Sequence, residues 1–247
     1  MKTYIWALPL RFFHWFLAFG FAATYLLGDF EEFHNFHFGI GLFVGTLLIF
    51  RILYGFFGNK YAHFRDFPIS PKNQIEFIKT FFGGTKTYAG HNPAASIVMI
   101  SIFLVGICCS ISGFLLYNTE YNSLINIQLN EDFLEETHEI LANLFLALVI
   151  FHLLGLLADA IFHSKTKTAI SMFSGYKNID AENTKLNAFQ KIFFFLWFLT
   201  SFAVLYWGTT FKTSENENNN QYINNQRNNY NNSEHEDDEH EEEEDDD

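Results

Sequence analysis

The chain of 247 residues carries 28 Asp and Glu against 15 Lys and Arg, which gives a formal net charge of −13. Half of the acidic residues, 14 of 28, lie between Glu215 and Asp247. The sequence before them is nearly neutral, very rich in Phe and without a basic cluster, which excludes a typical nucleic-acid-binding protein. We therefore separate an apolar body, residues 1–211, from a polar tail.

Five apolar segments follow in chain order, at residues 6–28, 37–57, 96–117, 137–161 and 189–209. Each is close to the ~20 residues that a helix needs to cross the ~30 Å hydrocarbon core of a bilayer. Helices are expected because backbone polar groups in lipid must be satisfied within their own segment. A signal peptide is disfavoured at the first segment, because Arg11 and His14 interrupt its apolar run. The sequence predicts an all-α integral membrane protein.

Lys and Arg alternate between the connections in a way that predicts the orientation of the spans. Of the 15 basic residues, 13 lie at the start of the first span or around the connections between spans two and three and between spans four and five. The other connections are acidic and contain Asp29, Glu31, Glu32, Glu120, Glu131, Asp132, Glu135 and Glu136. Because basic loops stay in the cytoplasm, we expect a cytoplasmic N-terminus and a periplasmic tail in a bacterial cytoplasmic membrane.

Histidines inside the apolar segments are the strongest functional signal, because ionisable residues in membrane helices are rare and usually functional. His14 lies in the first span, His37 opens the second, and His138 and His152 lie in the fourth. The last two are 14 residues apart. On a helix this spacing is a rise of ~21 Å with a rotation about 40° short of four turns. They therefore face the same side at different depths.

Antiparallel spans pair the four histidines by depth. His37 enters from the outer side and is level with His138, whereas His14 is level with His152 toward the inner side. Two imidazoles on facing helices can ligate a haem iron from opposite sides. The sequence thus predicts two haem b sites, with these residues as cofactor-binding and metal-ligating groups and with no catalytic residue. Hydrogen bonding between helices or an ion path fits four histidines paired by depth less well.

Other residues are weaker candidates. His34 lies one turn before His37 and competes with it as the outer ligand. His91, in Gly-His-Asn-Pro, is a candidate for contact with a haem propionate or a quinone head group, or belongs to a plain helix entry. Arg11 and Arg51 are candidate propionate partners, although basic side chains near helix ends also extend to the interface without a ligand. Room for a flat ring is expected at Gly39, Gly41, Gly45, Gly106, Gly113 and Gly155.

Several short motifs together resemble one family. The start Trp-Ala-Leu-Pro-Leu-Arg-Phe-Phe-His-Trp (Trp6–Trp15) resembles the opening of the prokaryotic cytochrome b561 and nickel–iron hydrogenase b-type cytochrome family. Further matches are His37-Phe-Gly-Ile-Gly, Phe50-Arg-Ile-Leu-Tyr-Gly-Phe-Phe-Gly, Gly90-His-Asn-Pro, Thr137-His-Glu-Ile-Leu-Ala and Phe151-His-Leu. They occur in order over roughly residues 4–178.

The resemblance implies a four-helix core with two b haems, in which His14, His37, His138 and His152 match the ligand motifs. It also implies electron transfer between the quinone pool and a partner redox protein, such as a hydrogenase subunit or a periplasmic c-type cytochrome. Whether the chain is an enzyme or only the electron-transfer subunit of a quinone-linked oxidoreductase is open. Two alternatives remain, a haem-containing reductase of superoxide or ferric ion and, from a different class, a metal-uptake protein.

Three regions are therefore expected. Residues 1–180 are expected to form the dihaem four-helix domain, and residues 181–211 a connection and a fifth membrane helix. Residues 212–247 are Asn-rich and then acidic, a composition that favours disorder. On the outer side this tail could attract a basic protein domain, collect divalent metal ions loosely, or only solvate the chain end.

Overall fold

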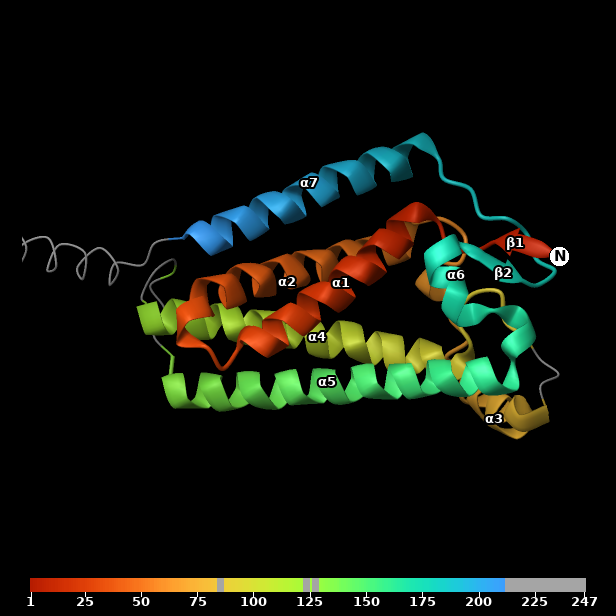
Figure 1. Cartoon of the computed structure of the whole chain (residues 1–247), viewed down its shortest axis with the longest axis horizontal. Helices are drawn as coiled ribbons and strands as arrows, with labels where there is room; N and C mark the ends of the chain where they lie inside the picture. The colour runs from red at the N-terminus through yellow and green to blue at the C-terminus, as the bar shows by residue number, and fades with distance from the viewer. Residues whose placement is uncertain (84–86, 122–124, 126–128, 212–247) are drawn as a thin grey trace, which may run out of the picture.

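The computed structural model describes residues 1–83, 87–121, 125 and 129–211. Its long helices are α1 (Leu8–Leu27), α2 (His34–Phe57), α4 (Pro93–Tyr121), α5 (Glu131–Phe162) and α7 (Ala188–Thr210). All five are long and apolar enough to cross a membrane, and they run along the long axis of the molecule (Figure 1). The prediction of an all-α membrane bundle with a fifth helix is confirmed. The predicted tail at 212–247 lies outside the described residues.

The shorter elements gather at one end of the bundle, which we call the inner end (Figure 1). They are α3 (Pro71–Thr80), α6 (Thr168–Ser174), β1 (Lys2–Tyr4), β2 (Tyr176–Asn178) and three 3₁₀ turns at Phe64–Asp66, Phe81–Gly83 and Ser164–Thr166. The strands pair antiparallel, with Thr3 opposite Lys177. This pairing joins the start of the chain to the segment after α5. A fourth 3₁₀ turn, Glu31–Phe33, precedes α2 at the opposite end, the outer end.

Helix α5 begins earlier than the apolar pattern predicts. The side chain of Asn130 accepts a hydrogen bond from the backbone N–H of Phe133 at 2.7 Å and caps the helix. Glu131 and Asp132 occupy the first turn, where negative charge is favoured by the helix dipole. The acidic residues expected in a loop therefore extend α5 outward as a polar first turn.

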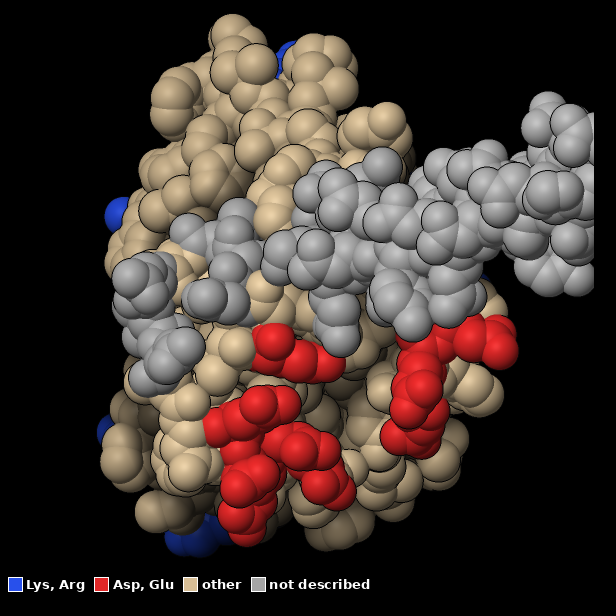
Figure 2. All heavy atoms as spheres, turned by 90° about the vertical axis from the view of Figure 1, so that its left-hand side faces the viewer, with Lys and Arg blue, Asp and Glu red and all other residues tan. Residues whose placement is uncertain are grey.

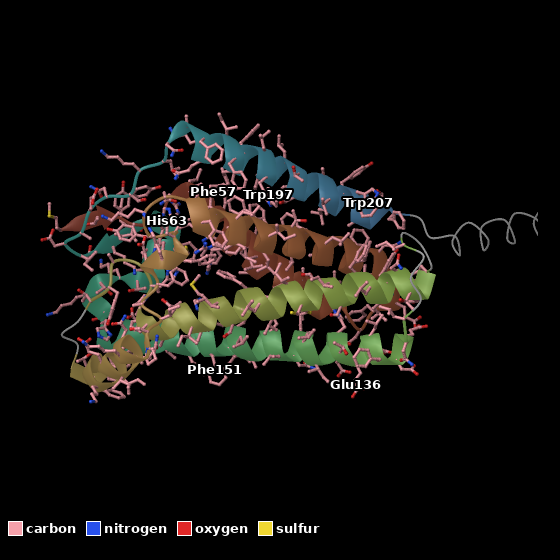
Figure 3. All side chains as sticks on the ribbon, turned by 180° about the vertical axis from the view of Figure 1, so that it is seen from behind. Phe57, His63, Glu136, Phe151, Trp197 and Trp207 are labelled. Atoms are coloured by element: carbon pink, nitrogen blue, oxygen red, sulfur yellow. The ribbon has the colours of Figure 1, made fainter. Side chains whose placement is uncertain are left out.

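Helix α2 is the central helix of the bundle. It packs against α1, α4 and α7, while α4 also packs along α5. Half of its most apolar 18-residue stretch is buried, compared with 6% for α5. Much of α5 thus presents apolar side chains outward, and Figure 3 shows Phe151 pointing away from the bundle. Such a surface fits lipid tails rather than water.

Helix α7 runs antiparallel to α2 and contacts it at three levels. Gln190 donates a hydrogen bond to the carbonyl of Phe57 at 3.1 Å, and the Trp197 indole donates to the carbonyl of Thr46 at 2.9 Å. Figure 3 shows Trp197 on the side of α7 that faces α2. Near the outer end, a Cβ atom built on Gly208 would lie 2.7 Å from the Cα atom of Gly39. Only a glycine pair permits this approach.

The two ends differ in charge. Every Lys and Arg within the described residues lies in the inner half of the bundle or in its loops. The outer end carries the acidic residues between α1 and α2, Glu120 in the last turn of α4, and the acidic residues of the first turns of α5. Asp and Glu gather in patches on this face in Figure 2. This separation of sign matches the alternation that the sequence shows between its connections.

Candidate haem-binding site

An outer pair of imidazoles lies between α2 and α5. The ring centroids of His37 and His138 are 6.1 Å apart, with an angle of 80° between the ring planes. Two metal–imidazole bonds of ~2 Å each, with ~1 Å from each nitrogen to its ring centre, span about 6 Å. The separation is thus the one required for a single metal ion between two imidazoles.

Both outer imidazoles are held through their Nδ1 atoms. Nδ1 of His37 lies 2.9 Å from the carbonyl oxygen of Thr24. Nδ1 of His138 lies 3.2 Å from the carbonyl of Cys109 and 3.0 Å from the hydroxyl of Ser112. A proton on Nδ1 that is donated to a carbonyl leaves Nε2 as the free lone pair, which is the arrangement of metal-binding histidines.

An inner pair lies between α1 and α5. The ring centroids of His14 and His152 are 6.4 Å apart, with 56° between the planes. Nδ1 of His14 is buried and has no hydrogen-bond partner among the described residues. The inner pair therefore has a similar spacing to the outer pair but lacks its hydrogen-bonded support at His14.

A cavity of about 720 Å³ adjoins the inner pair. Its volume falls within the range of pockets that enclose cofactors and drug-sized ligands. The lining is mainly apolar and aromatic, and it includes both inner histidines. Gly155 also lines it, and a Cβ atom at that position would meet nothing within 4 Å. A flat apolar ring can lie against this wall, so the residues present fit a haem.

Arg51, Lys177 and His91 also line this cavity. Arg51 is 1% exposed, and neither terminal nitrogen of its guanidinium has a hydrogen-bond partner among the described residues. Lys177 is 3% exposed, and its ammonium donates to the carbonyls of Tyr88 and Gly90 at 3.4 and 3.0 Å. His91 lies between the rings of Trp6 and Phe67. The lining is therefore mainly apolar, with the cationic groups of Arg51 and Lys177 and the carboxylate of Asp159 among its polar members.

Burial changes the protonation of two of these groups. It lowers the pKa of Lys177 from 10.5 to about 8, and Asp159 opposes the change. Burial also places the pKa of His91 well below its ordinary value of 6.5, and the charges of Arg51 and Lys177 lower it further. His91 is thus neutral at physiological pH, while Lys177 is only weakly held in its charged form.

The structure sorts the remaining candidates. His34 points toward α4, where Nε2 lies 3.7 Å from a Glu120 carboxylate oxygen and the ring contacts Tyr117, so it does not join the outer pair. His91 and Arg51 lie in the inner cavity, whereas Arg11 is not among the described residues that line it. His163 also lines the cavity and lies 3.6 Å from the Asp159 carboxylate.

The glycines expected to leave room for a ring have different roles. Gly39 approaches Gly208 and Thr209 of α7, Gly45 approaches Ser110, and Gly106 approaches Leu48 and Phe145. These three serve helix–helix packing. Gly41 has an ordinary contact with Thr24 at 3.9 Å. Of these six, Gly113 lies beside His138, and Gly155 lines the cavity of the inner pair.

Helices that place opposed imidazoles at two levels inside an apolar bundle define a membrane haem protein of the b-cytochrome class. The family model for prokaryotic cytochrome b561 matches residues 5–175, more than half of the chain. The chain belongs to the prokaryotic cytochrome b561 family. It is therefore a multi-pass membrane b-type cytochrome of electron transfer, and the family binds haem b. No curated protein and no solved structure matches the chain significantly.

Proposed function

We propose that this protein is a dihaem cytochrome that carries electrons across the cytoplasmic membrane between the quinone pool and a redox protein on the outer side. His37 and His138 ligate the outer haem, and His14 and His152 ligate the inner haem. The observation that carries the proposal is the repeated spacing of about 6 Å between opposed imidazoles, 6.1 Å at one level and 6.4 Å at the other.

The two levels form a relay through the bundle. His138 and His152 lie on one helix with a rise of ~21 Å between them, so their pairs lie toward opposite ends of α5. A haem at each level would supply one-electron redox chemistry. The protein contributes two ligands at each level, an apolar surrounding and hydrogen bonds to the outer ligands, which tune the potential. Because two imidazoles would hold the iron at each level, substrate chemistry there would be disfavoured.

The ends of the relay suit different partners. At the inner end, Ile78 of α3, Phe82 of the following 3₁₀ turn and Phe173 of α6 line the cavity and are largely exposed. This opening supports access for a lipophilic quinone from the membrane. At the outer end, the acidic surface supports association with a basic soluble protein, such as a c-type cytochrome, by long-range attraction. A hydrogenase subunit is the other partner of this proposal.

The orientation follows from the same charges. With the basic end in the cytoplasm, the N-terminus is cytoplasmic and the tail that follows α7 is periplasmic. Cysteine labelling tests this directly. Single cysteines are introduced at Asp180 or at Glu136 in a variant without Cys108 and Cys109. The cysteine at position 180 should react with an impermeant reagent only from the cytoplasmic side. The cysteine at position 136 should react only from the periplasmic side.

Haem content and its dependence on single histidines test the function. The purified protein should show a b-type reduced-minus-oxidised spectrum and about two haems per chain in a pyridine haemochrome assay. His37→Ala and His138→Ala should each remove the same haem, and His14→Ala and His152→Ala the other. His34→Ala is the matched control and should retain both haems. A purified protein without haem would overturn the proposal. So would a result in which His14→Ala and His138→Ala remove the same haem.

A further inference from the structure

Arg51 occupies on α2 the inner position that corresponds to His37. The two are 14 residues apart, the same spacing that places His138 and His152 on one side of α5. Arg51 lines the cavity that also contains His14 and His152. At the inner level α1 and α5 thus present imidazoles, whereas α2 presents a guanidinium.

The guanidinium is buried among aromatic rings. Its central carbon lies 5.0 Å from the ring centre of Phe64, 5.3 Å from that of Phe103 and 5.9 Å from that of Phe67. These contacts stabilise a cation only modestly. Both terminal nitrogens are buried without a hydrogen-bond partner among the described residues. A buried charge left in this way is strongly unfavourable unless an anion pairs with it.

The missing partner is an anion that enters the cavity. Arginine binds planar carboxylates through two parallel hydrogen bonds, and such pairs are stronger than neutral ones. A haem has two carboxylate side chains, which must also leave their water when the ring enters an apolar pocket. The buried guanidinium and a haem carboxylate are therefore complementary in charge and in hydrogen bonding.

We propose that Arg51 binds a propionate carboxylate of the inner haem and that Lys177 supplies a second cation to the same anionic side. This inference rests on the proposed function, because it takes the cofactor between His14 and His152 to be a haem. Lys177 fits the role because an ammonium has three donors and carbonyls accept two of them. Trp6 covers the ammonium at 5.1 Å from its ring centre and joins it to the wall of the cavity.

The outer pair has no equivalent. Within the described residues the outer end carries no Lys or Arg, and its charged surface is acidic. A nearby positive charge stabilises the reduced form of a redox centre, and a negative charge stabilises the oxidised form. Arg51 should therefore raise the potential of the inner haem above the value that it would have without this charge.

The experiment is a potentiometric titration combined with a haem count. Arg51→Gln should lower the ratio of reduced to oxidised inner haem about tenfold at a fixed potential, a downward shift of about 59 mV for a one-electron couple. Arg51→Lys should keep the charge but lose the two-point contact, and should give a smaller shift. Lys177→Gln should shift the same haem in the same direction. Arg65→Gln, an exposed inner-end arginine, is the control and should leave both potentials unchanged.

Measuring each variant also in the His37→Ala background assigns the shift, because only the inner haem remains there. If the Arg51→Gln protein loses haem altogether, the Arg51→Lys and Lys177→Gln variants decide the question, and unchanged potentials in both would overturn the inference. Two haems with unaltered potentials in Arg51→Gln would also overturn it and leave the proposed function intact. A wild-type protein without haem would instead overturn the proposed function.

Discussion

His138 lies directly against Gly113 of α4. A Cβ atom built on Gly113 would be 2.7 Å from Cε1 of the His138 ring, closer than real Cβ contacts permit. The absence of a side chain on α4 therefore fixes how the imidazole on α5 is directed toward His37.

Gly113→Ala should displace His138 and weaken the outer site. The added methyl group forces the ring away from Ser112 and from its partner, so we expect loss of most of one haem per chain with the inner haem retained. The pyridine haemochrome assay and the resolved potentials measure this. Gly83→Ala, where nothing lies within 4 Å of the added atom, should bind haem like the wild type. Equal haem content in both variants would contradict the role of Gly113.

Gly208→Leu should separate α7 from α2 without removing haem. The close approach to Gly39 leaves no room for a side chain, and overpacking of this kind costs about 1–3 kcal/mol. We expect a lower midpoint of thermal unfolding in detergent with two haems still bound, because α7 contributes no histidine. Ala203→Leu adds a similar volume at an exposed position of the same helix and should leave the midpoint unchanged. Loss of haem in Gly208→Leu alone would show that α7 supports the sites.

Neutralising the outer acidic surface should slow electron transfer to a basic soluble cytochrome. Four exposed residues, Glu31, Glu32, Glu135 and Glu136, are changed to Gln together. Electrostatic attraction raises association rates by about 10–10³-fold, so the second-order rate should fall several-fold and lose most of its salt dependence. Asp180→Asn, at the inner end, is the control. A rate that does not respond to charge or salt would remove the acidic surface from partner binding.

His91 should make the protein less stable as the pH falls. The pKa of His91 is well below 6.5 in the folded protein, so below about pH 6.5 the unfolded chain binds a proton that the folded protein does not. The free energy of unfolding then falls with decreasing pH, by up to about 1.4 kcal/mol per pH unit for one proton. Thermal unfolding of wild type and His91→Leu between pH 7.5 and 5 measures the difference. The variant should show the flatter dependence, and parallel curves would contradict the assignment.

Much of the fold follows from local sequence properties. Length and apolarity predict all five membrane helices, and a fixed helical rise predicts which histidines share a depth. Apolarity and helical rise are properties of one continuous segment, so they can be read from the sequence of that segment alone. The start of α5 is different, because the helix begins after the capping residue Asn130 and not where the apolar residues begin. Predicting this start requires the capping residue to count for more than the charges that follow it.

The inner cavity was less accessible to prediction. In the sequence Arg11 and Arg51 are equivalent candidates, because nothing local distinguishes an enclosed guanidinium from one that reaches the interface. Lys177 has the sequence context of a basic loop residue, and its burial depends on the pairing of β1 with β2, which are more than 170 residues apart. Contacts of such sequence separation leave no periodic signal in a single chain.

Both proposed sites take one ligand from α5, the fourth of the five long helices. Neither imidazole pair is complete while only α1, α2 and α4 have entered the membrane, and β2, with Lys177, follows later still. We therefore expect cofactor capture during biogenesis to follow the insertion of α5. Chains that stop before this helix should remain colourless, whatever the haem supply of the cell.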